Sequence, residues 1–160
     1  MRTLCKKLIM IILGVFIMPI GIVYAKIPAE QVAIGGITYK ASIDYIISIY
    51  GQPSRVKNGT YYWGKDESLI VTTWDSAKGQ TNYATSIMCS AANGLETPVG
   101  GAVGMPVDNV MLRYGRNAAS APDYIDYENE VYGYISDNGC LIYRARNGKI
   151  VKIEIVGYLT

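Results

Sequence analysis

The sequence of 160 residues predicts an α+β fold of two tandem αβββ repeats, each a short helical element packed on an antiparallel meander. Two amphipathic stretches share one spacing of apolar residues, and both end at a glycine. Three strand-like runs follow each stretch, and Asn-Gly, the strongest short signal for a hairpin, separates two pairs of them. We expect repeats at 36–98 and 99–160, after a leader at 1–25 and an N-terminal segment at 26–35.

The first 25 residues have the features of a secretory signal peptide. A basic start precedes an apolar run from 8 to 23, which Pro19 interrupts, and the small residue Ala25 suits a cleavage site. The run is short for a membrane-spanning helix. We therefore expect a periplasmic or secreted protein without a membrane anchor after cleavage, and an uncleaved N-terminal anchor is the alternative.

The charge balance argues against nucleic acid as a partner. The three charges of the leader are all basic, which leaves 12 of the 15 Lys and Arg residues against 13 Asp and Glu in residues 26–160. Nucleic-acid binding requires a basic surface, and this part of the chain is nearly neutral. An exported chain can also keep disulfides, so Cys89 and Cys140 are candidates for a bridge between the two repeats.

Both predicted helices have recognisable ends. They cover residues 43–50 and 107–114, with apolar stripes of Ile43, Ile46, Ile47 and Tyr50 in the first and Val107, Val110, Met111 and Tyr114 in the second. Ser42 can cap the first helix, and Pro106 suits the first turn of the second. Gly51 and Gly115 follow as expected C-caps, because glycine adopts the left-handed conformation that ends a helix.

Alternating apolar residues predict which strand residues face the helices. The expected strands cover 60–64, 68–74 and 83–91 in the first repeat and 129–136, 140–146 and 149–157 in the second. The residues predicted to face the core are Leu69, Val71, Thr73, Val131, Ile135, Leu141, Tyr143, Ala145, Val151, Ile153 and Ile155. The outer face then carries Trp74, Tyr132, Tyr134, Arg144 and Arg146.

Several short motifs of the second half are similar to those of a known family. They are Val103-Gly104-Met105, Val110, Tyr114-Gly115 and the run LIYRARNGKIVKI. This pattern resembles the domain of small outer-membrane lipoproteins that accompany the β-barrel assembly machinery, a fold that occurs in tandem in the β-lactamase inhibitor proteins. The resemblance covers most of 100–157 and, more weakly, 36–91. It implies helices on an antiparallel sheet and a non-catalytic, protein-binding role, although the chain lacks the lipid-bearing cysteine of the lipoproteins.

The outer-face residues are the predicted binding site for another envelope or secreted protein, which the chain would bind in the manner of an inhibitor. Trp, Tyr and Arg are the residue types enriched in interface hot spots, and the chain contains 14 tyrosines. In the alternative interpretation, the same aromatic side chains only pair across strands and stabilise the sheet.

The sequence offers little for catalysis, and we predict no enzyme, cofactor or metal. The chain has no histidine, which removes the usual general base and the commonest metal ligand. The acidic loop 122–130 matches no calcium-binding spacing. A carboxylate-dependent hydrolase or carbohydrate-active protein, using Asp126 with Glu128 or Glu130, remains an alternative, because glycosidases need only two acids. A purely structural envelope protein is the other alternative.

Overall fold

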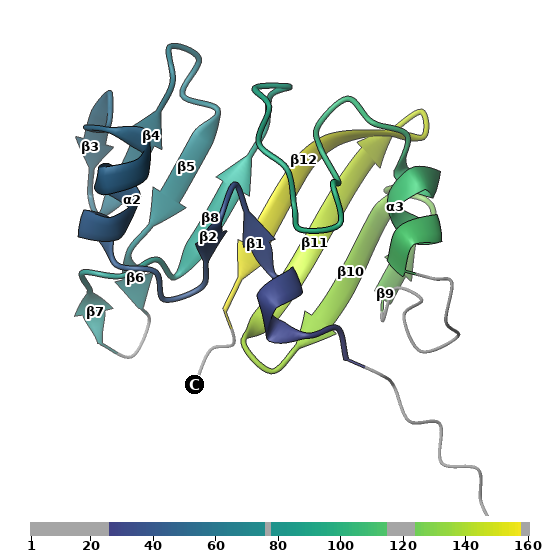
Figure 1. Ribbon diagram of the computed structural model, residues 1–160, viewed down its shortest axis with the longest axis horizontal. Helices are drawn as coiled ribbons and strands as arrows, with labels where there is room; N and C mark the ends of the chain where they lie inside the picture. The colour runs from purple at the N-terminus through teal and green to yellow at the C-terminus, as the bar shows by residue number, and fades with distance from the viewer. Residues whose placement is uncertain (1–25, 76–77, 115–123, 158–160) are drawn as a thin grey trace, which may run out of the picture.

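A large antiparallel sheet dominates the computed structural model, which describes residues 26–75, 78–114 and 124–157 (Figure 1). Its strands lie in the order β3-β4-β5-β8-β12-β11-β10-β9. Their bounds are β3 (Arg55–Lys57), β4 (Thr60–Trp63), β5 (Leu69–Thr72), β8 (Ser86–Cys89), β9 (Tyr124–Asp126), β10 (Val131–Ser136), β11 (Gly139–Arg146) and β12 (Lys149–Val156). Two small hairpins pair β1 (Ala33–Ile34) with β2 (Ile37–Thr38) and β6 (Trp74–Asp75) with β7 (Gly79–Gln80). The predicted α+β class with an antiparallel sheet is confirmed.

Both predicted amphipathic stretches are helical. They form α2 (Ile43–Tyr50) and α3 (Val107–Tyr114), and a short 3-10 turn, η1 (Ala29–Gln31), precedes β1. Ser42 caps α2 as expected, because its hydroxyl accepts the Tyr45 N–H at 3.2 Å, and Gly51 ends the helix at a φ of 75°. Gly115 and the predicted leader lie outside the described residues. None of the described helices is long and apolar enough to cross a membrane.

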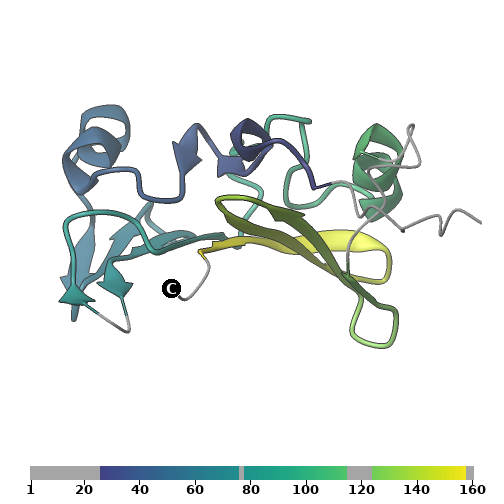
Figure 2. The same cartoon turned by 90° about the horizontal axis from the view of Figure 1, so that it is seen from below.

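The helices and the β1–β2 hairpin lie on one face of the sheet, and the core fills the space between these two layers (Figure 2). The largest fully buried side chains of this core are Ile34, Ile37, Ile46, Ile87, Tyr134, Leu141, Tyr143, Ile150, Ile153 and Ile155. In the described part of the chain, no helix or hairpin covers the opposite face (Figure 2). We call this opposite side the open face.

One strand pair joins the two halves of the chain into a single sheet. The strand β12 pairs with β11 on one side and with β8 on the other. Ile155 lies opposite Ile87 in the second of these pairs, and Ile153 lies opposite Cys89. All four side chains are buried, so the two halves share one core across this seam.

The structure adds an edge strand to each expected meander. β3 precedes β4, and β9 precedes β10, so each helix is followed by four strands of the large sheet where three were predicted. Asn58 and Gly59 connect β3 to β4 with φ angles of 50° and 71°, the left-handed pair that a two-residue hairpin turn requires. Asn147 and Gly148 form the predicted turn between β11 and β12 in the same way. The first of these Asn-Gly signals was available in the sequence and would have predicted β3.

The predicted inward orientation of Val151 is wrong, because β12 contains a β-bulge. The register shifts between Arg144 and Ala145, so that Arg144 lies opposite Lys152 while Ala145 lies opposite Ile150. Val151 is the extra residue, and 39% of it is exposed. Ile150 takes the core position, since a bulge reverses the alternation of side chains beyond it.

Candidate binding face of the sheet

Cross-strand pairing aligns one residue from each strand in a continuous row across the open face. Directly opposed residues point to the same side of a sheet. From one edge to the other the row consists of Arg55, Tyr62, Ile70, Met88, Glu154, Ile142, Gly133 and Tyr124. An aromatic ring thus lies near each end, three apolar side chains and Glu154 lie between, and Gly133 leaves one position of the row without a side chain.

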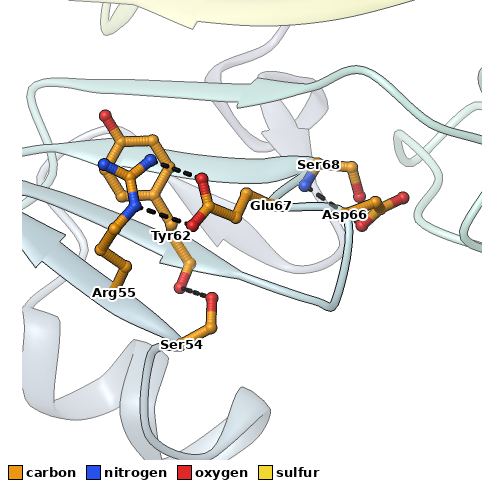
Figure 3. A network of polar contacts seen from close by, with 6 residues as sticks. All are labelled: Ser54, Arg55, Tyr62, Asp66, Glu67 and Ser68. Atoms are coloured by element: carbon orange, nitrogen blue, oxygen red, sulfur yellow. Dashed lines mark hydrogen bonds and ion pairs between the residues drawn. The ribbon is translucent and has the colours of Figure 1, made fainter.

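At the first end of the row, Arg55 holds an aromatic ring in place (Figure 3). The guanidinium carbon of Arg55 lies 3.7 Å from the centroid of the Tyr62 ring, a cation–π contact. Its Nε donates to Glu67 Oε1 at 2.7 Å, and its Nη2 donates to the second oxygen of the same carboxylate. These hydrogen bonds from Arg55 lower the pKa of the Glu67 carboxyl. The bidentate pair therefore fixes a flat arginine–tyrosine surface.

Near the centre of the open face, two cations share one carboxylate. Arg144 Nε lies 2.7 Å from Glu154 Oε2, and Lys152 Nζ lies 2.8 Å from Glu154 Oε1. Burial acts to raise the pKa of Glu154, but the hydrogen bonds and charges of Lys152 and Arg144 outweigh it, so this pKa lies below its ordinary value of 4.5. The cluster carries one net positive charge.

The lowered pKa of Glu154 predicts an acid-dependent contribution to stability. Because the folded pKa lies below the unfolded one, the contribution is complete above the ordinary pKa and is lost as pH falls through the folded value. Glu154→Gln should therefore flatten the decline of unfolding free energy below about pH 5, by no more than about 1 kcal/mol for these partly exposed charges. Urea titrations at several acidic pH values measure the effect. An unchanged slope in the variant would contradict it.

A pocket of about 570 Å³ opens on the open face beside this cluster. Its lining residues are Tyr124, Asp126, Asn129, Val131, Gly133, Ile135, Cys140, Ile142 and Arg144. Gly133 forms the floor, where a Cβ would meet the Tyr124 Cβ at 3.5 Å, an ordinary contact distance. The pocket therefore exists because a glycine stands in a row of larger side chains.

Three of the predicted binding residues are accessible. Trp74 is 59% exposed, but it lies on β6, in the small hairpin and not in the large sheet. Arg144 lines the pocket. Arg146 is exposed at the end of β11, opposite Lys149. The structure therefore places Arg144 on the open face beside the row, whereas Trp74 lies outside the large sheet and Arg146 lies at the end of β11.

The predicted outward orientation of Tyr132 and Tyr134 is wrong. Tyr132 is 8% exposed and Tyr134 is fully buried in the core. They lie opposite Tyr143 and Leu141, which face the core as predicted. The turn between β10 and β11 consists of Asp137 and Asn138, one position before the predicted Asn-Gly turn, since Ser136 pairs with Gly139. Any two-residue turn pairs even-numbered residues of one strand with odd-numbered residues of the next, so the predicted turn already implied the same faces. Val131 and Ile135, expected inside, line the pocket instead.

Tyr134 belongs to a buried tyrosine cluster beneath α3. Its ring centroid lies 4.3 Å from that of Tyr114 and 6.0 Å from that of Tyr143, which it meets edge-on. The Tyr143 hydroxyl donates to Thr97 Oγ1 at 2.8 Å. Burial raises the pKa of Tyr114 to about 12 and also raises that of Tyr143, so both rings stay neutral. These tyrosines serve packing.

The predicted bridge between Cys89 and Cys140 is absent, and both residues are thiols. Cys89 is buried in the core, whereas Cys140 lines the pocket on the open face. The strand β12 lies between their two strands, which places them roughly 10 Å apart across the sheet. They lie opposite Ile153 and Val156, so they are also about 10 Å apart along it, and a bridge requires Cα atoms within about 7 Å.

Two of the carboxylates proposed for the alternative hydrolase, Asp126 and Glu130, stabilise turns. Asp126 accepts the backbone N–H of Asn129 at 3.1 Å and its side-chain amide at 2.8 Å, and these hydrogen bonds lower the Asp126 pKa. Glu130 accepts the N–H groups of Asn147 and Gly148 at 2.9 and 2.8 Å. Among the described residues, no group of histidine, cysteine and acidic side chains has the arrangement of a metal site.

No protein-family model matches the chain, and neither a curated protein nor a solved structure is significantly similar to it. The resemblance to the lipoprotein domain and to the β-lactamase inhibitor proteins therefore stays a prediction.

Sequence reasoning missed the Arg55–Tyr62 pair and Gly133, the two features that shape the ends of the row. Asn58-Gly59 would have revealed the first, since it predicts that Arg55 and Tyr62 are directly opposed across a hairpin. Gly133 had no such signal. A glycine within a strand marks a pocket only once its neighbours on both sides are known.

Proposed function

We propose that this chain is an exported, non-catalytic protein-binding module of the cell envelope, acting in the manner of an inhibitor through the open face. The leader expected at 1–25 supports the location. The partner is another envelope or secreted protein, and the interaction needs no cofactor. The two tandem repeats belong to this proposal, with α2 and α3 as equivalent helices and β8 and β12 as the strands at which the repeats meet.

The observation that carries the proposal is the composition of the row across the open face. A sheet face that contacts only solvent is usually covered by polar residues. This row instead contains Tyr62, Ile70, Met88, Ile142 and Tyr124. Interface centres combine such apolar and aromatic side chains with arginine. Trp74 adds an exposed indole on the β6–β7 hairpin, outside the large sheet.

The size of the sheet also fits protein recognition. A stable interface buries about 800 Å² on each partner, and the open face extends over all of β3 to β9 in one surface. A carboxyl group that acts as a general acid near neutral pH needs a raised pKa, whereas the pKa values of Asp126 and Glu154 beside this pocket lie below their ordinary values. The proposed function therefore requires recognition and no chemistry.

Substitution of Arg144 on the open face, or of Trp74 on the β6–β7 hairpin, should weaken partner binding without unfolding the protein. Trp74→Ala or Arg144→Ala should each reduce affinity by about 1 to 4 kcal/mol, because both side chains are accessible anchors outside the core. The partner is first captured from the envelope fraction with the purified protein, and the Kd and Tm of each variant are then measured. Tyr45→Ala is the matched control, since Tyr45 is an exposed aromatic residue on α2, on the covered side. Loss of stability with intact binding would refute the proposal.

A further inference from the structure

The geometry points to a specific use of the pocket above Gly133: it receives a protruding aromatic side chain of the partner protein, with a carboxylate next to that side chain bound at Arg144. This inference rests on the proposed function and adds the chemistry of the partner segment. Three observations carry it, namely the shape of the pocket, its lining and the charges around its rim.

The shape comes from one missing side chain. Gly133 lies in the row between Ile142 and Tyr124, so the gap has an apolar wall on one side and an aromatic wall on the other. The volume of about 570 Å³ exceeds what water alone requires and can hold a large side chain. Because the floor is backbone, an inserted ring would lie against the sheet itself.

The lining favours an apolar group inside and a polar group at the rim. Val131, Ile135 and Ile142 form the apolar interior, and Tyr124 offers its ring at the edge. Buried aromatic anchors in such pockets, surrounded by residues that exclude water, dominate the energetics of protein interfaces. A partner segment fits better than a free metabolite, because the pocket opens onto a row that continues across the sheet through Glu154 to Met88 and Ile70, where an extended chain can make further contacts.

The charges at the rim favour a carboxylate next to the aromatic side chain that enters the pocket. Arg144 and Lys152 both contact Glu154, so this side of the pocket carries one more positive than negative charge. On the opposite side, the carboxylate of Asp126 accepts two hydrogen bonds from Asn129. A carboxylate of the partner is therefore attracted to the Arg144 side and repelled from the Asp126 side, which also orients the bound segment.

The direct test uses short peptides as probes of the pocket. Acetyl-Phe-Asp-amide is titrated into the purified protein, and NMR chemical shifts are followed. We expect saturable shifts at Gly133, Ile135 and Ile142 with a Kd of about 1 mM, which corresponds to roughly 4 kcal/mol. Acetyl-Phe-Lys-amide and acetyl-Ala-Asp-amide should each bind at least about threefold more weakly, since each lacks one of the two contacts. Equal binding of either, or of benzyl alcohol, would overturn the inference.

A substitution at Gly133 that fills the pocket distinguishes loss of the binding site from a general effect on folding. Gly133→Leu should abolish the peptide shifts and weaken binding of the captured partner by at least about tenfold, because the new side chain occupies the place of the anchor. Gly133 has no left-handed backbone, and its Cβ position is in ordinary contact only, so the Tm should not fall. If this variant does not fold, Gly133→Ala tests the same point with a smaller loss.

The outcomes distinguish the pocket from the proposed function. A partner that binds wild type and Gly133→Leu equally well, but not Trp74→Ala, would overturn the pocket and leave the protein-binding module intact. Peptide shifts that disappear in Gly133→Leu would support the pocket even if no partner were captured from the envelope fraction, a result that would count against the proposed function. Partner binding that is unchanged in Arg144→Ala would overturn the carboxylate contact of this inference.

Discussion

Replacing Tyr134 by alanine should lower the free energy of unfolding by roughly 3 to 5 kcal/mol, the loss expected when a large buried aromatic ring leaves a cavity. Tyr134 is fully buried, and its ring packs between those of Tyr114 on α3 and Tyr143 on β11. The neighbouring side chains cannot move in to fill the space, because the interior is close-packed and α3 itself packs on the tyrosine cluster through Tyr114. Urea unfolding followed by circular dichroism measures the change.

Tyr127→Ala is the matched control for this experiment. Tyr127 is 75% exposed in the turn between β9 and β10, so the same substitution removes almost no buried surface there and should change stability by less than about 0.5 kcal/mol. If Tyr134→Ala behaved like Tyr127→Ala, Tyr134 would not be a core residue. That result would restore the original prediction that it faces a partner.

Ile155→Ala should destabilise both halves of the chain together, by about 2 to 5 kcal/mol. Ile155 is fully buried on β12, and it pairs with Leu141 of β11 on one side and with Ile87 of β8 on the other. The truncation therefore removes packing from the seam that both halves share. Each half alone has about 60 residues, a size at which only roughly 60% of the chain surface is buried and stability is marginal.

Two probes can follow the halves separately in the same sample. Both tryptophans, Trp63 and Trp74, belong to the first half, and Trp63 is buried with its indole N–H donating to the Gly51 carbonyl at 2.9 Å. Tryptophan fluorescence thus reports the first half, and hydrogen exchange of the β10 amides reports the second. In Ile155→Ala the free energies of unfolding from the two probes should fall by the same amount, as in a two-state transition. A fluorescence midpoint that stays at the wild-type value would mean that the halves unfold independently.

Much of the local structure was predictable because it depends on neighbouring residues. The apolar spacing in 43–50 and 107–114 predicts both helices, since a helical period of 3.6 brings those side chains to one face. Ser42 and Gly51 act as caps through contacts within a single turn. The alternation in β5 and β11 correctly predicts Val71, Leu141 and Tyr143 as core residues for the same local reason.

The predictions failed where one strand had to be positioned against another. Tyr132 and Tyr134 lie on the opposite face from the one that their own strand predicts, because the pairing of β10 with β11 determines the face. Val151 was misplaced because a bulge is a property of two paired strands. The bridge between Cys89 and Cys140 failed because the order of strands, which places β12 between them, cannot be inferred from either strand.

The sequence by itself determined the α+β class, the two helices with their limits and most strand positions, because these follow from periodicity, caps and turn residues a few positions apart. Only the tertiary structure decided that β8 and β12 join the halves into one sheet and that eight residues from eight strands form one row. It alone shows that Gly133 opens a pocket beside Arg144. The physical reason is that this binding face consists of contacts between residues far apart in the chain, which depend on strand order and register and not on any local pattern.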